Sequence, residues 1–159
     1  MSRFLDVLVV SPLADGYTWY LDRPFGYRTD IGATKTIVVP SCFETDFASV
    51  PSPLWAIFPK WGTYGSAAIV HDWLYWRQEL RRDQADAVFL EAMTDSRVKP
   101  WKRRILYHAV RWFGGAAWRE NASLRARGVT RMQPAGAPPA GPRRPSWKRW
   151  TVLPRRRWA

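Results

Sequence analysis

The sequence predicts an α+β fold, in which a small N-terminal antiparallel β-meander packs with three or four helices and a disordered or extended basic C-terminal arm follows. Three observations support this class: segments typical of strands come before residue 40, helical spacing of apolar residues dominates residues 52–115, and the composition changes after Ala122. With 159 residues, 47% of them hydrophobic, the chain can bury a core. No apolar run reaches the roughly 18 residues of a membrane-spanning helix, so no transmembrane segment is expected.

Strands are expected in the first forty residues. Residues 4–10 and 17–21 are rich in β-branched and aromatic side chains, and the turn-forming residues 14–16 separate them. A short apolar segment at 36–39 is expected to form another strand, which a proline ends. Three prolines make the following segment, 40–53, a stiff loop without helical or strand periodicity.

Helical segments follow the loop. They are expected at residues 52–58, 66–77, 81–94 and from Pro100 onward. Ser66 has a side chain suited to the N-cap of the second segment, and Gly114–Gly115 should end or kink the last one. One face of that last helix is expected to hold Trp101, Ile105, His108 and Trp112. His108 is therefore predicted to be a core histidine.

Positive charge is concentrated toward the C-terminus. Residues 121–159 contain ten of the 25 Lys and Arg residues and none of the 13 acidic residues, which leaves residues 1–120 with a net charge of only +2. We therefore divide the chain into a compact domain (1–120), a linker rich in Pro, Gly and Ala (121–142) and a basic arm with tryptophans (143–159).

The arm is a predicted binding segment. Cations with interleaved Trp side chains suit the phosphate backbone of a nucleic acid, an anionic membrane surface or a neighbouring protein subunit, and a solubilising extension is the alternative. Docking on a subunit or a membrane ranks above binding to nucleic acid. The residues expected to make these contacts are Arg143, Arg144, Trp147, Lys148, Arg149, Trp150, Arg155, Arg156, Arg157 and Trp158.

A histidine and an aspartate, His71 and Asp72, lie in the otherwise apolar segment "AAIVHDWLYWR" at 67–77. On a helix, Tyr75 shares a face with His71, and Asp72 is rotated from it by about 100°. A carboxylate in such surroundings needs a cation, a metal ion or hydrogen-bond donors, and the histidine can act as a base near neutral pH. The alternative is an internal polar network, in which Asp72 pairs with one of the nearby arginines, Arg77, Arg81 or Arg82.

Three residues of the stiff loop have candidate chemical roles. Asp46 is expected either to supply a second carboxylate for a metal ion or for His71, or to hold its own loop through a backbone hydrogen bond. Ser49 lacks the motif of a nucleophilic serine, so a backbone-bonding role is expected. Cys42, the single cysteine, excludes an internal disulfide and a cysteine-built zinc site, and its side chain is predicted to be buried.

Three separated motifs, "VVPSCFETDFASVPSPLW", "AAIVHDWLYW" and "RRDQADAVFLEAM", resemble a phage and prophage family catalogued as domain of unknown function 1353. The resemblance covers about residues 5–115. It implies a phage origin and no particular reaction. Such a protein is expected to be made in the host cytoplasm and to reach the virion or the host envelope.

The order His71-Asp72-x-x-Tyr75 is similar to the active-site helix of secreted phospholipases of the A-two type. This resemblance implies that His71 is the general base that activates water, that Asp72 binds calcium and that Tyr75 orients the histidine. An aspartate from an antiparallel partner helix, Asp86 or Asp83, would complete the site, and we choose Asp86. Those enzymes contain many disulfides, which this chain cannot form.

These residues lead to a functional hypothesis: a phage-encoded accessory protein with a metal-assisted, histidine-based hydrolase site for an ester, such as a lipid or another envelope substrate. His71, Tyr75 and Asp86 are the expected catalytic residues. Asp72 and Asp46 are the expected metal ligands, with calcium as the ion. The alternative is a non-catalytic virion or tail-associated structural protein, whose arm docks on phage structural subunits or on nucleic acid.

Overall fold

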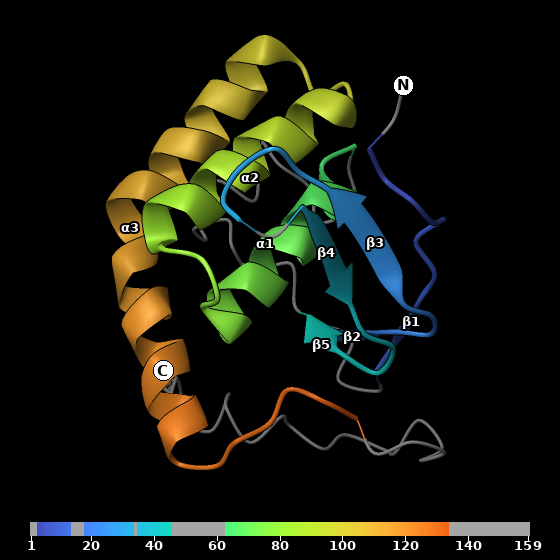
Figure 1. The fold of residues 1–159 in the computed structure, drawn as a ribbon, viewed down its shortest axis with the longest axis vertical. Helices are drawn as coiled ribbons and strands as arrows, with labels where there is room; N and C mark the ends of the chain where they lie inside the picture. Colours follow the sequence, from blue (N-terminus) through green and yellow to red (C-terminus); the bar gives the residue numbers. More distant parts are fainter. Residues whose placement is uncertain (1–2, 14–17, 34, 46–62, 134–159) are drawn as a thin grey trace, which may run out of the picture.

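The computed structural model describes residues 3–13, 18–33, 35–45 and 63–133. In these residues short antiparallel strands come first and three helices follow, so the predicted α+β class is confirmed (Figure 1). The helix expected at 52–58 and the basic arm lie outside the described residues. No helix in the described part of the chain is both long enough and apolar enough to cross a membrane.

The strands form two small antiparallel sheets instead of the single meander expected. Their bounds are Val10–Pro12 (β1), Trp19–Leu21 (β2), Phe25–Arg28 (β3), Thr36–Val39 (β4) and Glu44–Thr45 (β5). The first sheet has the order β1-β2-β5, and the second is the hairpin β3-β4. Neither β3 nor β5 was expected, because β3 contains a glycine and β5 is only two residues long within the proline-rich segment.

A sharp turn at Cys42 carries the chain from the second sheet into the first. Cys42 has a left-handed backbone with φ of 65°. Its N–H donates to the carbonyl of Leu21 (2.7 Å), and the N–H of Leu21 donates to the carbonyl of Phe43 (3.1 Å). The predicted burial of Cys42 is wrong, because the residue occupies this turn and is partly exposed. The turn places Thr45 of β5 opposite Trp19 of β2.

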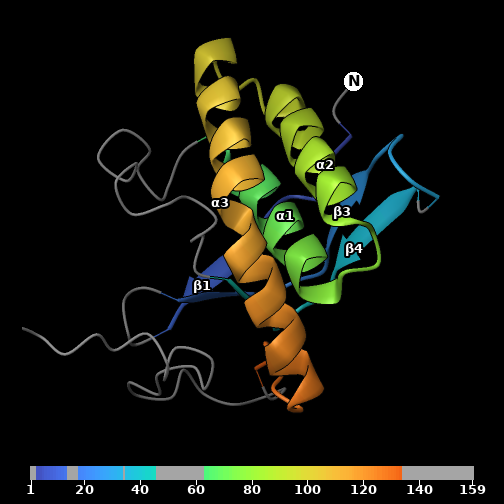
Figure 2. The same ribbon diagram turned by 90° about the vertical axis from the view of Figure 1, so that its left-hand side faces the viewer.

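Three helices make up the rest of the described chain: α1 (Gly65–Arg77), α2 (Arg82–Asp95) and α3 (Pro100–Ala126). α1 is the central element, with strands on one side and α3 on the other (Figures 1 and 2). Because α1 packs against α2, α3 and β4, most of its circumference is buried. The predicted bounds of α1 and α2 are confirmed to within one residue. The predicted N-cap at Ser66 is wrong, because α1 begins one residue earlier and Tyr64 holds the cap position.

Of the end or kink predicted for α3 at Gly114–Gly115, the end is wrong, since the helix continues to Ala126. Glycine disfavours a helix interior by only about 1 kcal/mol, so packing can override it. The reason for glycine at position 114 is a close approach: a Cβ atom there would overlap the hydroxyl group of Tyr75 and lie 3.2 Å from its Cζ atom. Gly114 therefore makes room for a side chain of α1.

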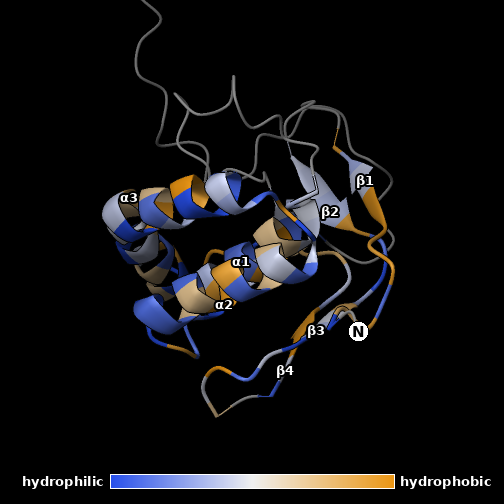
Figure 3. Ribbon diagram, turned by 90° about the horizontal axis from the view of Figure 1, so that it is seen from above, coloured by the Kyte–Doolittle hydropathy of each residue, from blue (hydrophilic) through white to orange (hydrophobic). Residues whose placement is uncertain are grey.

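α3 presents a different face to the core from the one expected. Its buried residues are Leu106, Ala109, Val110 and Leu124, whereas the predicted face of Trp101, Ile105, His108 and Trp112 is exposed. His108 is therefore not a core histidine. The orientation follows from Arg111, whose guanidinium group reaches inward to a buried carboxylate on α2. Hydrophobic and hydrophilic residues lie side by side along α3 as a result (Figure 3).

The chain after α3 returns to the strands. Residues 121–126, expected to begin the linker, are the last turns of α3. Farther along, the carbonyl of Arg131 accepts a hydrogen bond from the N–H of Glu44 (2.8 Å), and the Arg131 guanidinium lies 5.9 Å from the ring centre of Trp76. The packed body of the described chain thus extends to residue 133, and the arm residues follow it in sequence.

Alanine substitutions at Gly114 and Gly115 should distinguish the effect of close packing on stability from the effect of helix propensity. We expect Gly114→Ala to lower the free energy of unfolding by about 1–3 kcal/mol, because the new methyl group overpacks against Tyr75. Gly115→Ala is the matched control: its nearest neighbour is the flexible Arg119 side chain at 3.5 Å, so stability should be unchanged or rise by up to about 1 kcal/mol. Urea denaturation measures both, and equal effects would contradict the close approach.

Candidate functional site

A buried cluster of polar side chains lies between α1 and α2. His71 of α1 is completely buried, and its Nε2 atom is 3.0 Å from Oδ1 of Asp86 on α2. The hydroxyl group of Tyr75 donates to the same oxygen (2.7 Å). The structure therefore brings together the three predicted catalytic residues. Asp83, the alternative acid, is exposed and pairs instead with Arg81 (2.9 Å).

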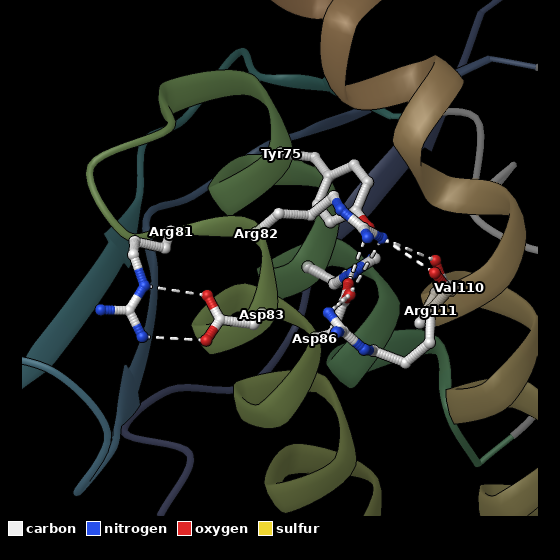
Figure 4. Close-up of polar contacts among 8 residues, drawn as sticks. Tyr75, Arg81, Arg82, Asp83, Asp86, Val110 and Arg111 are labelled. Carbon is white, nitrogen blue, oxygen red and sulfur yellow. Dashed lines mark hydrogen bonds and ion pairs between the residues drawn. The ribbon is translucent and has the colours of Figure 1, made fainter.

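The second oxygen of Asp86 faces two arginines. Nη1 of Arg111 on α3 lies 2.9 Å from Oδ2, and Nη1 of Arg82 lies 3.5 Å from it (Figure 4). Arg82 also donates to the main-chain carbonyls of Val110 (3.3 Å) and Arg111 (3.1 Å). The carboxylate thus has partners from all three helices, which compensate its removal from water.

The surroundings of Asp86 keep its carboxyl group ionised. Burial by itself raises the pKa of Asp86, but hydrogen bonds from His71, Tyr75 and Arg111 outweigh burial and hold this pKa below its usual range. The pKa of Tyr75 is raised by burial and by its hydrogen bond to Asp86. An ionised carboxylate can only accept hydrogen bonds, so Nε2 of His71 must carry a proton.

This bond determines where the lone pair of a neutral His71 lies. With the proton on Nε2, the free electron pair is on Nδ1. Nδ1 is buried and has no hydrogen-bond partner among the described residues. The ring lies against Tyr75 (4.1 Å between ring centres) and is stacked on Phe89 (4.6 Å). Because buried polar atoms nearly always have a partner, Nδ1 marks a position where one is required.

Asp72 points to a different set of groups. It is almost fully buried, and its Oδ2 atom accepts a hydrogen bond of 2.5 Å from the hydroxyl of Thr45, the last residue of β5. Within residues 3–13, 18–33, 35–45 and 63–133, no three His, Cys, Asp or Glu side chains are grouped so that they would hold a metal ion. The described residues do not by themselves fit calcium. Asp46 and Ser49 lie outside them, as do the predicted contact residues of the arm.

Sequence reasoning missed Arg111, which is a member of the cluster, and Thr45, which is the partner of Asp72. No local pattern connects either residue with its aspartate, because both contacts depend on how distant elements pack. Arg82 did have a local signal. It precedes Asp86 by four residues on the same helix, which is the spacing at which helical side chains of opposite charge meet.

The Asp86 carboxylate should make the stability of the fold depend on pH. Its pKa is lower in the folded protein than the value of about 4 in an unfolded chain, so it stabilises the fold above that value and ceases to do so as the pH falls toward the folded pKa. We expect Asp86→Asn to lower the free energy of unfolding at pH 7 by about 3 kcal/mol. This value is near the lower end of the losses seen when one partner of a buried ion pair is removed, because both arginines keep some contact with water.

Denaturation between pH 3 and pH 7 measures this effect. The loss of stability on acidification should be smaller in Asp86→Asn than in the unmodified protein. Asp83→Asn is the matched control on the same helix, because Asp83 also has a lowered pKa, of about 2, but its side chain is half exposed to solvent. It should change stability much less than Asp86→Asn. Equal responses of the two variants would contradict the role assigned to Asp86.

A comparison with protein-family models gives a match. Residues 19–110, more than half of the chain, match a family model described as "Protein of unknown function (DUF1353)". A search of curated proteins and a search of solved structures each gave no match. The matched segment includes His71, Tyr75 and Asp86. The chain belongs to the DUF1353 family.

Proposed function

We propose that this protein is a hydrolase in which His71 activates water for attack on an ester, with a lipid or another envelope molecule as the substrate. The proposal rests on the hydrogen bonding of the two ring nitrogens of His71. Asp86 holds Nε2 as a donor, and Nδ1 keeps a lone pair without a partner among the described residues. A histidine oriented by a carboxylate in this way is the usual arrangement of a general base.

In the proposed reaction, His71 acts first as the base and then as the acid. Nδ1 of His71 takes a proton from water while the water oxygen bonds to the ester carbonyl carbon, and the carbonyl electron pair moves to oxygen. The imidazolium is stabilised by Asp86 through Nε2–H. When the tetrahedral intermediate collapses, the ester C–O bond breaks, and Nδ1–H returns its proton to the departing alkoxide. The products are a carboxylic acid and an alcohol.

The neighbours of His71 have separate tasks in this proposal. Tyr75 positions the carboxylate by donating to Asp86, while Arg111 and Arg82 keep it ionised, so Asp86 does not itself take the proton. Asp72 holds the end of β5 beside α1 through Thr45. A bound calcium ion would polarise the ester carbonyl. The described residues contain no group of three His, Cys, Asp or Glu side chains that would hold this ion.

The burial of His71 favours a second candidate function, a structural role. The His71 ring is fully buried against Tyr75 and Phe89, and the groove between β4 and the end of α1, lined by residues such as Trp73 and Arg77, does not include it. In this alternative the cluster is an internal polar network. The protein would then be a structural component of a phage particle, attached to its partner subunits by the arm.

Hydrolysis assays on variants of the two histidines distinguish these functions. We expect His71→Gln to lower the rate about 10²–10⁴-fold on a panel of acyl esters and phosphatidylglycerol vesicles, the range typical of a lost general base. His108→Gln is the matched control, because His108 is exposed on α3, and it should retain full activity on a soluble ester. Circular dichroism and thermal unfolding establish that each variant is folded.

Tyr75→Phe gives a second readout if His71→Gln fails to fold. It keeps the aromatic packing and removes one hydrogen bond to Asp86, so kcat should fall several-fold with little change in KM. The hydrolase is disproved if the unmodified protein cleaves nothing on the panel, or if folded His71→Gln is as active as the unmodified protein. Either result favours the structural role.

A further inference from the structure

The outer side of α3 carries a line of large exposed apolar side chains, which we call the α3 ridge: Trp101, Ile105, Trp112 and Phe113. Their exposed fractions are 50%, 40%, 74% and 66%. The first three lie four and seven residues apart, so they share one helical face. His108 lies between them, with its ring stacked on Trp112 (5.4 Å between ring centres). The ridge belongs to the helix that lies nearest the viewer in Figure 2.

Basic residues are frequent in the segment that contains the α3 ridge. Residues 96–119 contain no acidic residue and seven basic ones: Arg97, Lys99, Lys102, Arg103, Arg104, Arg111 and Arg119. Arg111 is engaged by Asp86, whereas Arg104 and Arg119 are exposed. The ammonium group of Lys102 lies 5.4 Å from the ring centre of Trp101, at the beginning of the helix. The ridge is therefore a strip of indole, phenyl and aliphatic groups on a helix that carries six basic residues and one acidic residue, the exposed Glu120.

We propose that the α3 ridge binds the surface of an anionic lipid bilayer. Exposed Trp, Phe and Ile side chains would enter the boundary between head groups and acyl chains, and the flanking Arg and Lys side chains would contact lipid phosphates. Trp is the residue type that prefers this boundary. The helix lies along the surface in this arrangement. The proposal stands without the hydrolase, because it rests on the outer face of α3 alone.

Two other occupants fit this surface less well. A second copy packed symmetrically on the ridge would bring two sets of cations together, and α3, with six basic residues and Glu120 as its one acidic residue, offsets only a small part of this repulsion. A nucleic acid would satisfy the cations, but its bases would leave the aliphatic Ile105 without a suitable environment. An anionic bilayer satisfies both features of the surface, the charge and the apolar strip.

Flotation of the full chain with lipid vesicles tests the proposal without any measurement of hydrolysis. We expect binding to vesicles of equal parts phosphatidylglycerol and phosphatidylcholine, and much weaker binding to pure phosphatidylcholine. The ridge variant, Trp101→Ser with Trp112→Ser, should bind the anionic vesicles at least about tenfold more weakly. Arg104→Gln should weaken binding about fivefold at low salt, and by less when salt screens the surface.

The arm supplies the matched control, because it is also basic and contains Trp. The variant Trp150→Ser with Trp158→Ser removes the same number of indoles and should lose less affinity than the ridge variant. Because the ridge side chains are exposed, thermal unfolding should show that the ridge variant is as stable as the unmodified protein.

Two results of the flotation assay would overturn the proposal: no binding of the unmodified chain to anionic vesicles, or undiminished binding of the ridge variant. A third would be a result in analytical ultracentrifugation. If the unmodified chain is a dimer, the ridge variant is a monomer and vesicle binding is unchanged, the ridge is a contact between two copies of the chain. Undiminished binding of the ridge variant would assign the membrane contact to the arm.

Discussion

The buried carboxylate of Asp86 is the group on which the arrangement of the helices depends. A charge removed from water without partners would destabilise the protein by several kcal/mol, so its partners must be in place whenever the chain is folded. They come from α1 through His71 and Tyr75, and from α3 through Arg111. One charged group thereby sets how two helices are rotated against a third.

The same bonds connect stability with chemistry. The arginines keep Asp86 ionised, the ionised carboxylate requires a proton on Nε2 of His71, and the lone pair of the ring is left on Nδ1. The contacts of Asp86 and of the Nε2 atom of His71 would be the same in a purely structural network and in a catalytic site. What distinguishes them is the group that meets Nδ1, and the described residues supply no hydrogen-bond partner for it.

The position of α3 follows from these requirements more than from its own hydrophobicity. Gly114 lets Tyr75 approach closely enough for its hydroxyl to reach Asp86, and Arg111 turns its side of the helix inward. The largest apolar side chains of the first half of α3, such as Trp112, are consequently left on the outside. An apolar strip that the core does not use is available for a surface that lies outside the molecule.

The sequence alone determined the features that depend on local periodicity. It predicted strands before helices, the bounds of α1 and α2, and the shared face of His71 and Tyr75, because spacing along a helix specifies which side chains are neighbours. It also named Asp86 as an acid for this site, through a resemblance that left Asp83 as an alternative.

Only the tertiary structure decided which faces meet. The rotation of α2 selected Asp86 over Asp83, the packing of α3 brought in Arg111 and exposed His108, and a turn paired β5 with β2. Periodicity places residues on a common face, but contacts between elements far apart in the chain determine which face is buried, and no local pattern encodes them.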